Sequence, residues 1–171
     1  MKNKILLCLF LSLAISTVKA QGEYQNKIYK DYIKTVECYN TSKEQSFPVI
    51  NLKSSETLTF AFDDLRGGQK NFTYVVEHCT WDWKSSRINI LDYLEGVQQD
   101  ILFNYRYSFN TLVKFTHYQM TFPNDQMKVK IGGNYILKIY EDNDPNKVVI
   151  TQRFHVLNNT INIGAEVVPA T

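Results

Sequence analysis

One stretch near the middle of the sequence, residues 72–83, constrains the fold more than any other. It reads FTYVVEHCTWDW and combines aromatic and β-branched side chains more densely than the rest of the chain. With a period of two, the alternate side chains from Phe72 to His78 share one face, and those between them share the other. This pattern predicts a half-buried central strand, with Trp81 and Trp83 placed to close one end of a core.

The same alternation recurs along the chain between short turns. It is clearest at 57–63, and it returns with one apolar face at 105–109 and 117–122. Residues 33–39 and the short piece 47–52, which contains a proline, have the character of edge strands. Residues 135–156 predict a hairpin around the polar turn 141–146.

About seven short strands with antiparallel connections predict an all-β fold, an immunoglobulin-like or fibronectin-type antiparallel β-sandwich. The turn at 63–68 ends in Gly67 and Gly68, which take positive φ without a steric penalty. It predicts that the strands at 57–63 and 72–79 are hairpin neighbours.

A connection at 84–104 is too long for a simple hairpin. Its apolar residues have nearly helical spacing, although Gly96 weakens any long helix. Two explanations stay open: a lid packed over one end of the sandwich, or an exposed apolar surface for a partner.

The first twenty residues have the pattern of a secretory signal peptide. Lys2 and Lys4 precede an apolar run of roughly 14 residues, and the small-x-small sequence at 18–20 marks a cleavage site before Gln21. The run is short for a membrane span, and the sequence has no other candidate. We therefore predict an exported, soluble protein with a cleaved signal peptide and no membrane insertion of its own.

The expected domain organisation follows from this segment. It comprises a signal peptide at 1–20, a polar lead at 21–32, the β-sandwich at 33–157, and at 158–171 a linker with the first strand (161–168) of a truncated second domain. The chain has 19 Lys and Arg against 17 Asp and Glu. Removal of Lys2, Lys4 and Lys19 with the signal leaves 16 against 17, one net negative charge. A nearly neutral protein has no general attraction for phosphate backbones, so we expect no nucleic-acid partner.

Export leaves Cys38 and Cys79 in an oxidising compartment, where a disulfide is possible. The alternative is two small buried thiols on different strands, because a bridge requires Cα atoms closer than about 7 Å.

Catalytic and metal-binding patterns are weak in this sequence. His78 lies on the buried face of its strand, which favours a core histidine over a general base, and His117 and His155 fall on outward faces. No histidine or cysteine pair has zinc-site spacing, and the acidic turn at 142–144 continues as a hairpin turn and not as a calcium loop. We expect no enzyme activity, cofactor or small-molecule substrate. Sugar stacking on Trp81 and Trp83 stays open beside a core or lid role.

Several blocks of the sequence resemble a known family. They are FAFDDLRGGQKNFTYVVEHCTWDW, YRYSFNT, THYQMTFPN and GGNYILKIYEDNDPNKVVITQRFHV. Together they are similar to the amino-terminal domain of the plug protein of the bacterial type IX secretion system, over about 33–168. The positions that carry the resemblance are Asp63, Asp64, His78, Trp83, Phe109, Asn110, Phe122, Pro123, Asp144 and Pro145.

The resemblance implies a non-enzymatic periplasmic protein that seals the wide outer-membrane β-barrel translocon while no cargo is in transit. As a hypothesis, the contact with the translocon includes Trp81, Trp83, Leu91, Tyr93 and Leu94. Two alternatives remain, an exported carbohydrate-binding module and a generic adhesive sandwich.

Overall fold

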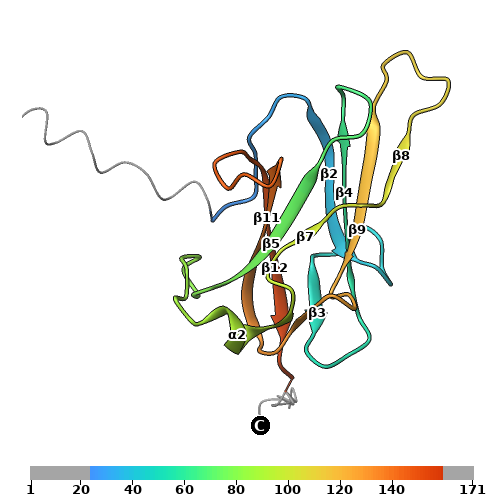
Figure 1. Cartoon of the computed structure of the whole chain (residues 1–171). Helices are drawn as coiled ribbons and strands as arrows, with labels where there is room; N and C mark the ends of the chain where they lie inside the picture. The colour runs from blue at the N-terminus through green and yellow to red at the C-terminus, as the bar shows by residue number, and fades with distance from the viewer. Residues whose placement is uncertain (1–23, 160–171) are drawn as a thin grey trace, which may run out of the picture.

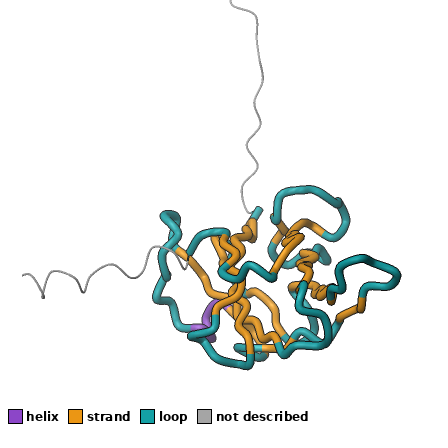
Figure 2. The backbone as a smooth tube through the Cα atoms, turned by 90° about the horizontal axis from the view of Figure 1, so that it is seen from above, coloured by secondary structure: helices purple, strands orange, loops and turns teal. Residues whose placement is uncertain are grey.

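The computed structural model describes residues 24–159, which form two β-sheets packed face to face (Figure 1). The strands are β1 (Lys27–Ile28), β2 (Ile33–Asn40), β3 (Val49–Asn51), β4 (Leu58–Asp64), β5 (Phe72–Cys79), β6 (Leu94–Gly96), β7 (Asp100–Ile101), β8 (Tyr105–Tyr107), β9 (Thr116–Phe122), β10 (Met127–Val129), β11 (Gly133–Glu141) and β12 (Val148–Leu157). A single short helix, α2 (Ile90–Tyr93), lies among the described residues. From above, the loops surround a centre made of strands (Figure 2).

One sheet has the order β1-β12-β11-β5-β7, and β3 adds to β12 in parallel. The other has the order β2-β4-β9-β8, and β6 and β10 form a small separate ladder. The all-β sandwich is therefore confirmed. Six of the strands have only two or three residues, so the six longer ones form most of both layers.

The predicted hairpin of β11 and β12 is confirmed, since the two strands pair in antiparallel register from Gly133 and Val156 to Tyr140 and Val148. The predicted pairing of β4 with β5 is wrong. β4 pairs with β2 and β9, whereas β5 pairs with β11 and β7. The turn after Asp64 thus crosses from one sheet to the other. Such a crossover is typical of sandwiches, in which consecutive strands often belong to opposite layers.

The core lies between the sheets and is rich in aromatic rings. Phe62 of β4 stacks on Tyr118 of β9 with centroids 5.2 Å apart, and Phe72 of β5 meets Tyr118 edge-on at 4.9 Å. Further along β11, Tyr135 stacks on Phe154 at 5.3 Å. Such pairs contribute about 0.5 to 1.5 kcal/mol beyond burial of their area. The contact between Phe72 and Tyr118 joins the two layers, because these residues belong to different sheets.

The polar lead crosses the outer side of the larger sheet. The Thr151 hydroxyl donates to the Gln25 carbonyl at 2.6 Å, and the Arg153 amide donates to Asn26 Oδ1 at 2.7 Å. Tyr24 donates to Glu77, whose other oxygen pairs with Lys138 at 2.8 Å. This strap explains why Lys138 is buried on an outward-facing position. The predicted strand at 161–168 and the signal peptide lie outside the described residues.

Candidate interaction surfaces

A tight turn after β5 separates the two tryptophans. The Trp83 amide donates to the Thr80 carbonyl at 3.1 Å, and the Thr80 amide donates to the Lys84 carbonyl at 2.8 Å. Asp82 accepts from Thr80 and pairs with Lys84 at 2.6 Å. This network holds Trp83 at a positive φ of 59°.

The two indoles consequently have different environments. Trp83 meets the His155 ring edge-on at 5.3 Å and lies under the Arg153 guanidinium at 4.2 Å. Trp81 is 87% exposed. The Trp83 ring is packed between these two neighbours, which supports a structural role for it. Trp81 alone is free to meet a partner.

The other three predicted contact residues lie in or directly after the helix α2, and they differ in exposure to solvent. Asn89 caps it by accepting from the Leu91 amide at 3.0 Å, and Leu91 itself is 60% exposed. Tyr93 and Leu94 are buried in the core, and the Tyr93 ring lies 5.9 Å from the ring of His78. The prediction that Tyr93 and Leu94 touch a partner is therefore wrong. The segment is a lid whose inner side closes the core and whose outer side carries Leu91.

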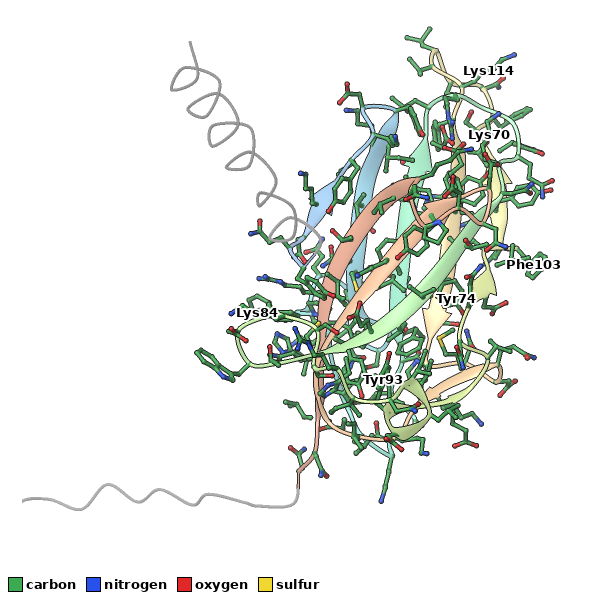
Figure 3. The ribbon with its side chains drawn as sticks, turned by 60° about the vertical axis from the view of Figure 1, so that its left-hand side comes forward. Lys70, Tyr74, Lys84, Tyr93, Phe103 and Lys114 are labelled. Carbon is green, nitrogen blue, oxygen red and sulfur yellow. The ribbon has the colours of Figure 1, made fainter. Side chains whose placement is uncertain are left out.

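We call Trp81, Ile88 and Leu91 the lid surface, since all three are exposed and lie in the turn and lid after β5. In Figure 3 this region, marked by Lys84 and Tyr93, lies at one end of the molecule.

A second apolar surface lies on the hairpin between β8 and β9, where sequence reasoning expected a buried face. Phe109 is 86% exposed, Val113 is 59% exposed and Leu112 is fully exposed. We call these three residues the hairpin tip. The alternation at 105–109 continues beyond β8, which ends at Tyr107, so Phe109 has left the sheet. The sequence marks the turn after β8 only by Asn110, a residue type that tolerates positive φ. In the structure its φ is 54°.

Two of the family positions are carboxylates that contact neighbouring side chains. Asp63 lies 2.7 Å from His117 Nδ1 on the neighbouring strand β9. Asp64 is completely buried and accepts from Arg66 Nη2 at 2.7 Å, from Arg66 Nε and from the Arg66 amide. The Arg66 guanidinium also reaches Glu141 at 2.8 Å and lies 3.7 Å from the Tyr32 ring. Because Glu141 belongs to the other sheet, this network joins the two layers.

His78 is a packing residue. Its ring meets Tyr135 edge-on at 5.0 Å, and its Nδ1 is buried without a hydrogen-bond partner in the part of the chain that the structure describes. Burial lowers the pKa of His78, and a backbone hydrogen bond to Gly132 partly opposes this. A neutral imidazole at neutral pH fits a structural role.

The remaining family positions shape turns. The bond between Phe122 and Pro123 is cis, and Asn124 then accepts from the Gln126 and Met127 amides. In the β11–β12 turn, Asp144 accepts from the Asn146 amide at 2.9 Å, and Pro145 follows it.

The two cysteines are free thiols, which corrects the possible disulfide. Cys38 pairs with Phe60 across β2 and β4 and so shares its inward face. Cys79 lies two residues after Glu77 and so shares the outward face of the other sheet. The thiols therefore lie on opposite sides of the β5 sheet. Burial raises the pKa of each to about 12.

The type 9 secretion system plug protein first-domain model matches residues 33–158. The chain belongs to this family. Membership relates this domain to type IX secretion. The family is not one of enzymes.

Comparisons with solved structures agree with the fold of this plug domain. A hypothetical protein from Parabacteroides merdae ATCC 43184 has a TM-score of 0.76 and 28% identity, covering 80% of this chain and 34% of that chain. The plug-family chain thus spans about a third of that protein. An alkylpurine DNA glycosylase, AlkC of Pseudomonas fluorescens, has a TM-score of 0.34 and 11% identity over 73% of this chain and 30% of its own, too low to relate the folds. No curated protein matches the sequence.

Between Tyr24 and Asn159, no three acidic, histidine or cysteine side chains gather as metal ligands would. Within the same residues, no helix has the length and apolar character that crossing a membrane requires.

Proposed function

We propose that this domain closes the periplasmic mouth of the outer-membrane β-barrel translocon of the type IX secretion system while no cargo is in transit. The observation that carries the proposal is the family match over 33–158. The signal-peptide pattern at 1–20 supports export to the periplasm. The domain acts by occupying space, and it transforms no molecule.

The size of the domain suits this role. A body of this length has a radius of gyration of roughly 15 Å and a diameter of about 40 Å. That is too large for the lumen of a porin with about 16 to 18 strands, but it is suitable for the largest known barrels.

The stiffness of the domain also suits a seal. The stacked rings of Phe62 and Tyr118 lie against Phe72, and the ion pair of the buried Asp64 with Arg66 extends to Glu141. Both sets of contacts cross from one sheet to the other, so the layers resist sliding. A seal must also detach, which favours a small contact with a polar rim over a permanent apolar interface.

The lid surface supplies one such contact. Trp81 and Leu91 are exposed, and around Trp81 lie the charged side chains of Asp82 and Lys84, which pair with each other at 2.6 Å. An exposed indole with a polar surround is typical of the residues that contribute most to binding.

Co-purification with the translocon tests the proposal. A chain with Trp81→Ser and Leu91→Ser should lose capture by the purified barrel, because both side chains point away from the core. Phe47→Ser is the matched control, since Phe47 is equally exposed on another loop and should be dispensable. Undiminished capture of the double variant would exclude the lid surface, and failure of the unmodified chain to bind would exclude the proposed role.

A further inference from the structure

The hairpin tip has no role in the fold. Phe109, Leu112 and Val113 are exposed and belong to a hairpin that extends beyond the sheet at the upper right of Figure 1. Three large apolar side chains are thus exposed within five residues of one protruding turn, and clusters of this kind often mark an interaction site.

The tip is held in a defined shape. The Ser108 amide donates to the Phe115 carbonyl at 2.9 Å, and the Phe115 amide donates back to Ser108 Oγ at 3.0 Å. At the apex, Thr111 Oγ1 donates to the Val113 carbonyl at 2.8 Å. The hairpin tip therefore loses little conformational entropy when a partner binds. A rigid apolar tip binds more tightly than a flexible one for this reason.

The base of the hairpin is anchored to the turn after β4. Thr116 Oγ1 donates to the Gly68 carbonyl at 2.8 Å, and the Tyr105 hydroxyl donates to Gln69 Oε1 at 2.9 Å. The hairpin is thus tied to the sheet that contains β4 and β9.

The charges near the tip are basic. Figure 3 shows Lys114 and Lys70 at this end of the molecule, and Arg106 lies on β8. Among the described residues, the neighbouring carboxylates are engaged elsewhere, Asp63 with His117 and Asp64 with Arg66. A partner with acidic groups around an apolar pocket complements this arrangement.

The apex itself favours a protein partner over a lipid bilayer. Asn110 and Thr111 are exposed at the turn between Phe109 and Leu112. Moving an amide into hydrocarbon without a hydrogen-bond partner costs about 2 to 7 kcal/mol, which cancels much of the gain from burying Leu112. A protein pocket can supply that partner.

The two apolar surfaces lie at opposite ends of the domain. In Figure 1 the hairpin lies at the upper right and α2 at the lower left, and in Figure 3 Lys114 and Tyr93 are again at opposite ends. A body held in a wide mouth at a single point can pivot and leak. Contacts at both ends fix it across the opening.

We infer that the hairpin tip is the second of two contacts with the translocon, inserting Phe109, Leu112 and Val113 into an apolar pocket with an acidic rim on the wall of the barrel mouth. This inference rests on the proposed function, because that function supplies the partner. It adds a binding site at the opposite end from the lid surface.

Affinity measurements with the purified translocon in detergent test the inference. The unmodified chain, Phe109→Ser, Leu112→Ser and the control Phe47→Ser are compared, with circular dichroism and thermal melting showing that each is folded. We expect each tip substitution to raise the dissociation constant at least tenfold and the control to leave it unchanged. Unchanged affinity of the tip variants beside a binding unmodified chain would overturn the inference alone. Absence of binding by the unmodified chain would overturn both.

A photo-crosslinking residue at position 112 identifies the neighbour directly. The inference expects covalent attachment to the translocon in native outer-membrane vesicles. Attachment only to lipid, or only to a second copy of the chain, would overturn it.

Discussion

The imidazole of His78 occupies the space that a side chain at position 133 would need. A Cβ built on Gly133 would lie 2.5 Å from His78 Nε2, and the φ of this residue is 147°, outside the usual range of L side chains. Gly133 is the first residue of β11 and pairs with Val156 of β12. Its contact with His78 therefore sets how closely the end of β5 packs against the β11–β12 hairpin.

Gly133→Ala should therefore lower the free energy of unfolding by about 2 to 4 kcal/mol, through overpacking and backbone strain together. Gly68→Ala is the control, because Gly68 also has a positive φ of 68° but nothing lies within 4 Å of its added Cβ. It should cost only about 1 kcal/mol. Urea unfolding of both variants gives the comparison, and equal losses would show that His78 does not press on Gly133.

Asp64→Ala should cost about 1.5 to 3 kcal/mol, because it removes a buried carboxylate that accepts three N–H groups of Arg66, whose guanidinium is partly in solvent. Asp142→Asn weakens the exposed pair with Lys147, keeps a residue type that tolerates the positive φ of 55° at this position, and should have no measurable effect. Chemical unfolding measures both. A loss at Asp64 no larger than at Asp142 would contradict the view that this network joins the two sheets.

The sequence predicted the strands far better than their partners. Alternation identifies β4 and β5 because each buries one face, but it does not say which strand lies beside them. Alternation with a Gly-Gly turn therefore predicts a hairpin at Asp64 equally well, although the chain crosses there to the other sheet. Alternation also does not show that 105–109 lies at a sheet edge, where Tyr107 on β8 is 59% exposed and Phe109 beyond it is 86% exposed. In the lid, apolar spacing could not separate Leu91, which is exposed, from Tyr93, which is buried.

Both thiols should be unreactive in the folded protein. With the pKa of Cys38 and Cys79 raised to about 12 by burial, only on the order of one thiol in ten thousand is ionised at pH 8. Ellman's reagent should therefore react with neither cysteine until denaturant is added. A mass two daltons lower under non-reducing conditions, with no reactive thiol after unfolding, would show a disulfide instead.

Stability should decrease as the pH falls below 6.5. Burial lowers the pKa of His78 below its ordinary value of 6.5, so the unfolded chain binds the proton more readily. The contribution of neutral His78 to the free energy of unfolding is therefore complete above pH 6.5, and it is lost as the pH falls toward the pKa that His78 has in the folded state. His155 acts in the same direction, because burial and Arg153 lower its pKa too.

His78→Phe should consequently reduce the slope of melting temperature against pH between about pH 5 and 7, while His155 retains part of it. Thermal melts across this range measure the slope. An unchanged slope would mean that His78 titrates alike in the folded and unfolded chains.

The central claim, that this domain seals the translocon, is tested most directly by conductance. The purified barrel is inserted in a planar bilayer, and the domain is added to the side that corresponds to the periplasm. The account predicts that the large open-channel current falls, and that Trp81→Ser combined with Leu112→Ser abolishes this block. An open current that is unaffected by saturating amounts of the folded domain would contradict it.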